Sequence, residues 1–192
     1  MNRIIDYKSG GKDFSFEELN AGLQLQLPLY AAAVGAADTV GMYYMPITDI
    51  PAGSAETGEA VKELNAKLLE RFRLNGLSLR DAAVLAATED FEGASSVVKV
   101  KYDANGSPVG TGLVDEAELS EVISFAKRMA ARTLERIFEG DAAVAPARIV
   151  KKQKAACRFC PYGDVCRFDP DGGRNGYRDV YPMSADTYFG RN

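Results

Sequence analysis

Short stretches of apolar and β-branched residues predict strands at two places in the chain. The first covers residues 3–7, turns polar at its end and stops at Gly10-Gly11, a turn sequence. The second covers residues 39–47 and is rich enough in β-forming residues to be a central strand. A hairpin follows at residues 96–112, where Val, Val and Tyr alternate with Lys before the Asn105-Gly106 turn.

Apolar positions at helical spacing predict a long helix over residues 16–35, with Ser15 as its N-cap and Glu18 at the capping-box spacing. Its apolar positions are Leu19, Leu23, Leu27, Tyr30 and Val34. Proline cannot continue the hydrogen-bond ladder of a helix, so Pro28 predicts a kink near Gln24.

Three further helices are predicted downstream. After a loop that contains Pro51, Gly53 and Gly58, a helix presents Val61, Leu64, Leu68 and Phe72 and should stop at Gly76. Ser78 should cap a shorter helix over residues 79–87. The longest helix should begin at Asp115 with Glu118 and end at Gly140; its expected buried face is Leu119, Val122, Ile123, Ala126, Met129, Ala130, Leu134, Ile137 and Phe138.

The character of the chain changes at residue 146, where it becomes basic and loop-like. We therefore expect two parts, residues 1–145 as an α/β domain and residues 146–192 as a C-terminal segment that acts as a clamp. The basic run of this segment comprises Arg148, Lys151, Lys152, Lys154 and Arg158. Such a run can hold phosphates, although a solvated surface is its commoner role.

Composition narrows the possible chemistry. The 192 residues include no histidine, which excludes Ser-His-Asp triads and most zinc enzymes. The net charge of −4 gives no overall attraction to nucleic acid, so any such binding must come from a local patch. No apolar run approaches the length of a membrane span and no signal peptide is evident, so we expect a cytoplasmic protein without membrane contact.

Asp6 and Lys8 lie two residues apart at the end of the first strand, so their side chains point to the same face. A carboxylate there can bind Mg²⁺, and a lysine beside it can orient an attacking water. A modest surface ion pair is the other reading, and the motif alone favours it.

Gln26 and Tyr30 lie four residues apart on the predicted helix and share one face. Once buried, an amide and a phenol on an otherwise apolar face need polar partners. A core tyrosine beside a partly exposed glutamine explains the pair equally well.

The three cysteines of the chain, Cys157, Cys160 and Cys166, lie within ten residues of one another. Thiolates at this spacing bind a soft metal or an iron–sulfur centre, and the odd number argues against a disulfide framework. Either kind of centre needs a fourth ligand, and the chain holds no further cysteine and no histidine to supply it.

Together, "IIDYKSG", "GLQLQLPLY" and "CRFCPYGDVCRFD" resemble the catalytic strand, the Q-x3-Y motif and the cysteine cluster of RecB-like PD-(D/E)xK nucleases with an iron–sulfur cluster. Among these, the chain looks most like the AddB-type nuclease domains of bacterial AddAB helicase–nucleases. "FRLNGLSLRDAAVL" and "YRDVYP" add to the likeness, which covers nearly the whole chain.

The resemblance implies a restriction-endonuclease-like mixed sheet flanked by helices, with the first strands of the core missing and a C-terminal cysteine-rich loop segment. Residues 3–7 and 40–47 should then be neighbouring strands with the helix of residues 16–35 packed across them. A second metal-binding Asp and a fourth cysteine, which the family carries further upstream, are absent from this chain. We therefore expect a fragment of a larger protein that is inactive by itself.

Carried over by position, Asp6 and the backbone carbonyl of Tyr7 would bind Mg²⁺ and Lys8 would be the catalytic lysine. The Gln26 and Tyr30 side chains would brace the active site and contact DNA, with Lys151 and Lys152 as further DNA contacts. The three cysteines would ligate three irons of a [4Fe–4S] cluster.

The implied function is Mg²⁺-dependent exonucleolytic cleavage of DNA, beside an AddA-type subunit, in double-strand break repair by homologous recombination. Three alternatives stay open. They are a CRISPR-associated adaptation exonuclease, a non-catalytic DNA-binding module whose cysteine loop is structural, and a zinc-ribbon-like interaction protein.

Overall fold

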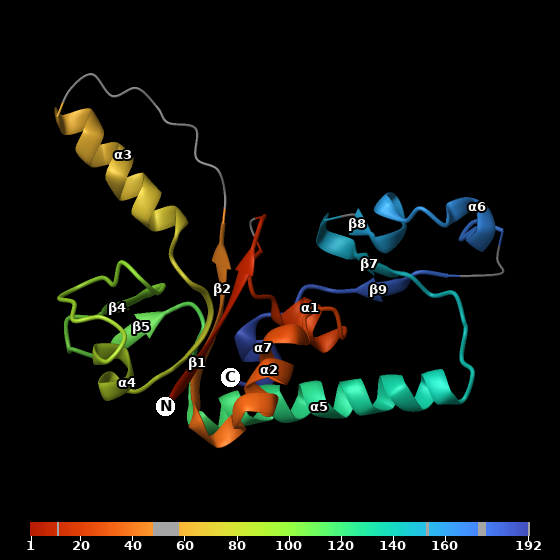
Figure 1. The fold of residues 1–192 in the computed structure, drawn as a ribbon, viewed down its shortest axis with the longest axis horizontal. Helices are drawn as coiled ribbons and strands as arrows, with labels where there is room; N and C mark the ends of the chain where they lie inside the picture. Colours follow the sequence, from red (N-terminus) through yellow and green to blue (C-terminus); the bar gives the residue numbers. More distant parts are fainter. Residues whose placement is uncertain (11, 48–57, 153, 173–175, 192) are drawn as a thin grey trace. The chain divides into compact units, whose positions relative to one another are not determined.

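The computed structural model describes residues 1–10, 12–47, 58–152, 154–172 and 176–191 (Figure 1). The chain forms two compact units. The first comprises residues 1–14 and 25–127, and the second comprises residues 15–24 and 128–192. The boundary crosses the longest helix, whereas the predicted division at residue 145 follows composition. That division stays a prediction.

A four-stranded mixed sheet organises the first unit. Its strands are β1 (Asn2–Lys8), β2 (Thr39–Pro46), β3 (Asn75–Leu79) and β6 (Leu113–Val114), in the order β1-β2-β3-β6. Strand β2 runs parallel to β1 and antiparallel to β3, and β3 runs parallel to β6. The predicted pairing of the first two strands and the central place of β2 are confirmed.

Helices and a hairpin complete the first unit. The helices are α2 (Gln26–Val34), α3 (Gly58–Arg71), α4 (Ala82–Ala86) and the first half of α5 (Glu116–Phe138). Helix α2 packs on β1 and β2, as expected. Strands β4 (Val100–Tyr102) and β5 (Pro108–Gly110) form the predicted hairpin. An apolar core brings together Tyr43, Leu74, Leu85, Val98, Val100 and Leu113.

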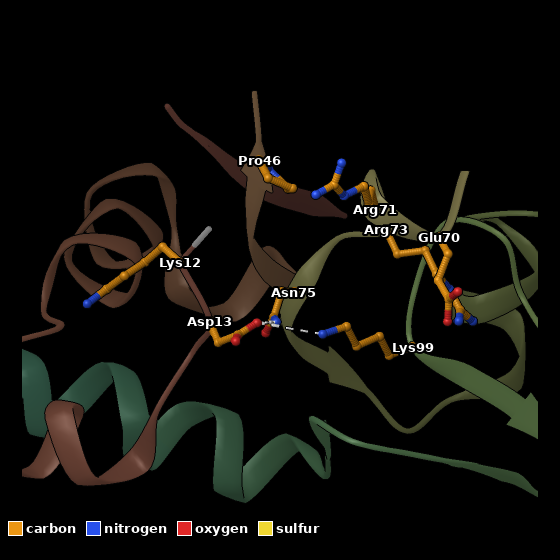
Figure 2. A pocket seen from close by; sticks show the side chains of 8 residues that line it. All are labelled: Lys12, Asp13, Pro46, Glu70, Arg71, Arg73, Asn75 and Lys99. Carbon is orange, nitrogen blue, oxygen red and sulfur yellow. Dashed lines mark hydrogen bonds and ion pairs between the residues drawn. The ribbon is translucent and has the colours of Figure 1, made fainter. Parts of the chain in front are cut away.

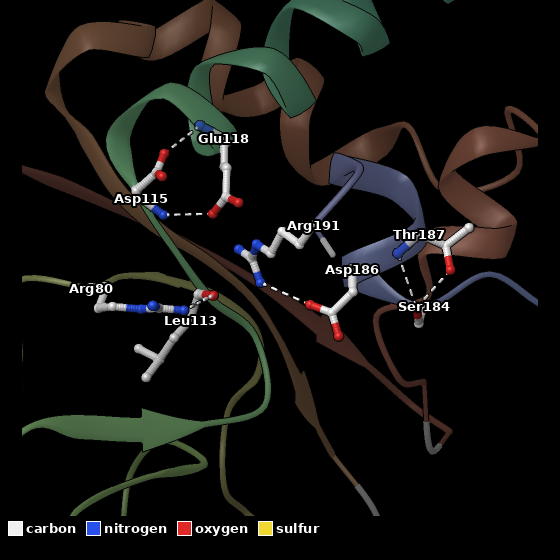
Figure 3. Close-up of polar contacts among 8 residues, drawn as sticks. All are labelled: Arg80, Leu113, Asp115, Glu118, Ser184, Asp186, Thr187 and Arg191. Carbon is white, nitrogen blue, oxygen red and sulfur yellow. Dashed lines mark hydrogen bonds and ion pairs between the residues drawn. The ribbon is translucent and has the colours of Figure 1, made fainter.

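The start of α5 shows why local sequence signals succeed. Figure 3 shows the reciprocal contacts of a capping box, in which the Glu118 backbone N–H donates to Asp115 Oδ1 at 2.8 Å and the Asp115 N–H donates to Glu118 Oε2 at 2.9 Å. Gly140 follows the helix with a φ of 77°, which favours glycine. The predicted buried face holds only for the first half, because Leu134, Ile137 and Phe138 are exposed.

The helix predicted over residues 16–35 is instead two helices. Helix α1 (Phe16–Asn20) ends before Gly22, whose φ is 75°, and α2 begins at Gln26. Ser15 caps α1 as expected, but its own N–H donates to Gln24 Oε1 rather than to Glu18. The polar link between Gln24 and Glu18 replaces the second half of the capping box and closes a turn where a kink was predicted.

Two predictions between residues 72 and 87 are wrong. Gly76 does not stop a helix but lies inside β3, and Ser78 lies in the same strand, where its hydroxyl meets that of buried Tyr43 at 2.8 Å. Asp81 caps α4 instead, by accepting from the N–H groups of Ala83 and Val84. The predicted loop around Pro51 and Gly53 lies outside the described residues.

The second unit holds a small sheet where a loop was predicted. Its strands are β7 (Ala147–Ile149), β8 (Lys154–Ala155) and β9 (Arg178–Val180), in the order β8-β7-β9. The short helices α6 (Gly163–Cys166) and α7 (Ala185–Phe189) belong to the same unit. Ser184 caps α7 (Figure 3), and the rings of Phe16 and Tyr188 meet with centroids 5.1 Å apart between α1 and α7. No helix among the described residues is long and apolar enough to cross a bilayer.

Candidate active site

Asp6 and Lys8 form an ion pair at the end of β1. Lys8 Nζ lies 2.6 Å from Asp6 Oδ2, and both side chains are largely shielded, with 31% and 16% of their surface exposed for Lys8 and Asp6 respectively. Alternation along the strand places both on one face, and the other face carries the exposed side chains of Ile5 and Tyr7. The predicted pair therefore exists, and because water is partly excluded, the Coulomb attraction between its charges is less screened than in a fully exposed ion pair.

Gln26 connects this pair to Tyr30. Lys8 Nζ donates to Gln26 Oε1 at 2.7 Å, and Gln26 Nε2 donates to the Tyr30 hydroxyl at 2.9 Å. An ammonium is only a donor, so it fixes which end of the amide faces Lys8. Because the tyrosine hydroxyl accepts from Gln26, its own proton is available to an acceptor outside, and 47% of this tyrosine is exposed. The structure thus brings Asp6, Lys8, Gln26 and Tyr30 into one chain of contacts.

Tyr44 on β2 is a neighbour of the site that the sequence did not reveal. The Lys8 ammonium lies 5.4 Å from the centroid of its ring, and Tyr44 is the register partner of Asp6. An aromatic face attracts a cation, so the ring adds to the contacts that hold Lys8. A strand rich in aromatics gave no sign of which ring would face the lysine, because that depends on the register between β1 and β2.

One atom of this site is suited to a cation. Asp6 Oδ2 is buried and, apart from its ion pair with Lys8, accepts no hydrogen bond of good geometry within the part of the chain that the structure describes. A buried carboxylate oxygen that accepts no other hydrogen bond fits one ligand position of a hard metal ion. Across the same described residues, no three His, Cys, Asp or Glu side chains lie close enough together to form a metal site.

The three cysteines belong to the second unit, and Cys157 and Cys160 share one turn, in which the Cys160 N–H donates to the Cys157 carbonyl at 3.1 Å. Cys157 follows β8 in a 3₁₀ turn (Ala156–Phe159), Cys160 ends that turn, and Cys166 is the last residue of α6. All three are free thiols, and Cys160 and Cys166 are exposed. Their chemistry fits a soft metal centre, but their placement does not gather them into one group. Their role as cluster ligands stays a prediction.

The basic residues predicted to contact DNA also belong to the second unit. Lys151 is exposed, and Lys152 Nζ lies 3.9 Å from Glu18 Oε1. Arg148 is committed to Asp179, to which it donates two hydrogen bonds of 2.7 and 2.9 Å. The Arg158 guanidinium lies 5.4 Å from the centroid of the Phe159 ring. Much of the predicted basic run therefore has protein neighbours, and its contact with DNA stays a prediction.

Comparison with known proteins points to one family. A profile of the PD-(D/E)XK nuclease superfamily matches residues 2–167. Proteins described as one of the subunits of an ATP-dependent helicase/deoxyribonuclease are similar over nearly the whole chain. The protein from Desulforudis audaxviator is 33% identical over 194 residues, which cover 95% of this chain and 16% of the relative. The proteins from Caldanaerobacter subterraneus and Symbiobacterium thermophilum are 30% and 31% identical, over 93% and 98% of this chain. The chain thus spans about a sixth of the length of these relatives.

Proposed function

The chain belongs to the PD-(D/E)XK nuclease superfamily, and on that premise we propose that it is the nuclease module of a helicase–deoxyribonuclease subunit. Its reaction is the hydrolysis of phosphodiester bonds in DNA. The observation that carries the proposal is the contact chain from Asp6 through Lys8 and Gln26 to Tyr30. The descriptions of the relatives support DNA as the substrate and a helicase as the associated activity. Exonucleolytic cleavage beside an AddA-type subunit in recombinational repair belongs to the same proposal.

Mg²⁺ is the proposed cofactor of the cleavage. The Asp6 carboxylate and the backbone carbonyl of Tyr7 would hold it, and the buried Oδ2 of Asp6 supports the first of these ligands. When bound, the ion supplies positive charge that polarises a phosphate and makes a coordinated water more acidic.

The side chains of the site have separable roles. Lys8 holds a positive charge beside Asp6, where it can orient an attacking water and offset charge on the phosphate. Gln26 holds Lys8 in place and, through its other amide end, orients Tyr30. The free proton of Tyr30 can be donated to a phosphate oxygen, which makes this residue a DNA contact. Precise positioning of this kind contributes a large part of the rate in phosphodiester hydrolysis.

A [4Fe–4S] cluster on Cys157, Cys160 and Cys166 is a separate part of the proposal. Three thiols within ten residues, in a chain without histidine, support it chemically. The arrangement of the described residues does not fit it, because it brings no three cysteine, histidine or acidic side chains into one metal site. No step of the cleavage depends on it.

The test is cleavage of linear end-labelled DNA with Mg²⁺ by the full gene product assembled with its helicase partner. Lys8→Ala should lower the cleavage rate by about 100-fold or more, because a positioned acid–base group contributes on that scale. Lys67→Ala, which removes an exposed lysine paired with Glu63 on α3, is the matched control and should cleave normally. ATP-driven unwinding should be the same in the wild type and both variants.

The 192-residue chain alone should cleave slowly or not at all, because its described residues bring together no group of three acidic, cysteine or histidine side chains. Normal cleavage by Lys8→Ala in the assembled protein would overturn the proposal. DNA binding without cleavage by the assembled wild-type protein would favour the non-catalytic binding module.

A further inference from the structure

A basic cavity of about 310 Å³ lies in the first unit, outside the contact chain of the site. Figure 2 shows its lining, in which four cationic side chains outnumber two carboxylates. The lining residues are Lys12, Asp13, Pro46, Glu70, Arg71, Arg73, Asn75 and Lys99. The chain as a whole is acidic, with a net charge of −4, so this local excess of positive charge runs against its composition.

The sheet register places this cavity beside the candidate active site. Asp6, Tyr44 and Asn75 are successive register partners across β1, β2 and β3, so their side chains share one face of the sheet. Pro46, another lining residue, is the partner of Lys8, and the N–H of the next residue, Ile47, donates to the Lys8 carbonyl at 2.7 Å. Two strand spacings separate Asp6 from Asn75, which is about 10 Å.

The floor of the cavity is built from side chains that are fixed in place. Asn75 accepts from the Phe14 N–H at 3.2 Å and donates to Asp13. Arg73 donates to the backbone carbonyls of Ser95 and Val98, the latter at 3.1 Å, so it anchors the loop before β4. These contacts commit Asn75 and Arg73 to the fold.

Lys99 and Arg71 are the cations placed to bind a ligand. Lys99 points toward the Asp13–Asn75 pair (Figure 2), and its ion pair with Asp13 is long, at 3.7 Å, with 43% of the lysine side chain exposed. The Arg71 guanidinium points toward Pro46 and is exposed, whereas Lys12 extends away from the other lining side chains. A long, exposed ion pair costs little to open, so Lys99 can exchange Asp13 for a phosphate.

We propose that this cavity is a second phosphate-binding site, in which Lys99 and Arg71 hold the backbone of the DNA strand at a point about 10 Å across the sheet from Asp6. The inference rests on the proposed nuclease function, since a strand lying at Asp6 continues along the same face of the sheet. Contacts to phosphate fix the position of a strand and carry no sequence information. The site therefore sets the register of the strand against Lys8 for any sequence.

The test measures binding without cleavage. Fluorescence anisotropy of a labelled oligothymidine is recorded with the 192-residue chain in EDTA over a series of salt concentrations. Lys99→Ala and Arg71→Ala should each weaken binding by about threefold or more at low salt, and the double variant should lower the slope of log K against log salt by about 1.4, which is about 0.7 for each lost contact. Lys99→Arg keeps the charge and should bind as the wild type does. Lys67→Ala removes the same charge from an exposed lysine and should also bind normally.

Two outcomes would overturn this second site, and both differ from failure of the proposed function. Equal affinity and equal salt slope in the wild type and the double variant would show that the strand does not use the cavity. An equal loss in Lys67→Ala would show that net charge alone was measured. If instead the variants lose affinity as expected but the assembled protein does not cleave DNA, the binding site stands and the nuclease proposal fails.

Discussion

Different kinds of internal contact stabilise the two units of the chain. The first unit buries a cluster of large apolar side chains on a four-stranded sheet. The second unit has three very short strands, and among its described apolar residues Leu19, Ala147 and Val180 are buried while Phe159 and Val165 are more than 80% exposed. Burial of apolar surface is the main source of stability in a domain. The first unit is therefore stabilised by its own core, and the second depends far more on polar and ring contacts.

Those polar and ring contacts of the second unit are specific. Arg148 on β7 binds its register partner Asp179 on β9 with two hydrogen bonds and stacks its guanidinium 4.6 Å from the centroid of the Tyr177 ring. Arg178 donates to the Ala21 carbonyl at 2.7 Å. A bidentate guanidinium–carboxylate pair has defined geometry but contributes little energy when water reaches it. The contacts of the second unit therefore have defined geometry but contribute little free energy to its stability.

The largest effect expected from this contrast concerns two glycines. At Gly76 in β3, an added Cβ would lie 2.0 Å from the carbonyl oxygen of Met42, so Gly76→Ala would force β2 and β3 apart. At Gly163 in α6, nothing lies within 4 Å of an added Cβ. Gly76→Ala should cost about 4 kcal/mol or more in the free energy of unfolding of the first unit. Gly163→Ala should be neutral or stabilise by up to about 1 kcal/mol, because alanine restricts the unfolded chain.

Denaturant unfolding followed by hydrogen exchange, which reports on each unit separately, measures both changes. Tolerance of Gly76→Ala would mean that β2 and β3 are not packed as closely as the register places them. Destabilisation by Gly163→Ala would mean that the second unit has tight packing around α6.

Gly76 also shows where prediction from the sequence failed. Signals confined to a few neighbouring residues were interpreted correctly, such as the Asp115–Glu118 capping box and the hairpin turn at Asn105-Gly106. Strand β3 was missed because its five residues begin with an asparagine and a glycine, which are poor strand formers. What makes Gly76 necessary is the backbone of β2, which lies more than 30 residues earlier in the chain. A requirement of that kind depends on the pairing of strands, and no local pattern reveals it.

The candidate site also has one part that local sequence patterns predicted and another part that they did not. The Asp6–Lys8 and Gln26–Tyr30 pairs follow from strand and helix periods, and the structure places all four together. Tyr44 was missed because its place beside Lys8 depends on the register of β2 against β1. The cations of the basic cavity come from three separate segments, so no motif joins them.

A smaller effect is expected in native-state hydrogen exchange. Amides of residues 119–126 in α5, where Leu119, Val122, Ile123 and Ala126 are buried, should exchange slowly. Amides of residues 155–172, which include the cysteine loop, should exchange fast in metal-free protein, because their side chains are mostly exposed. If a metal or cluster binds the three thiols, reconstitution should slow exchange in residues 155–172 alone, since a ligand bound to the native state stabilises it. Equal protection of both segments without metal would show that packing holds the loop, and the idea of a cluster that fastens it would be wrong.

The smallest expected effect is a change in melting temperature with pH when one carboxylate in each unit, Glu89 or Asp179, is replaced. Burial alone would raise the pKa of Glu89, but hydrogen bonds from Ser95, Ser96 and the Val97 N–H outweigh it and hold this pKa below its usual value. The hydrogen bonds from Arg148 likewise lower the pKa of Asp179. A carboxyl whose pKa is lowered by folding stabilises the protein above its unfolded pKa, and the stabilisation is lost as the pH falls through the folded value. Glu89→Gln and Asp179→Asn should therefore each lower the melting temperature at about pH 7, and the difference from the wild type should shrink below about pH 4.

Salt should change the effect of Asp179→Asn but not that of Glu89→Gln. The partners of Glu89 are neutral hydroxyls and backbone amides, so about 1 M salt should leave the effect of Glu89→Gln nearly unchanged. Asp179 and Arg148 form an ion pair whose side chains are 27% and 37% exposed, and at 1 M salt the screening length falls to about 3 Å. The effect of Asp179→Asn should therefore be small at low salt and smaller still at high salt. Melting curves at both salt concentrations measure this. An effect of Asp179→Asn that exceeds that of Glu89→Gln and persists in salt would show that the Arg148–Asp179 pair contributes far more than an exposed ion pair does. The statement that the contacts of the second unit contribute little free energy would then be wrong.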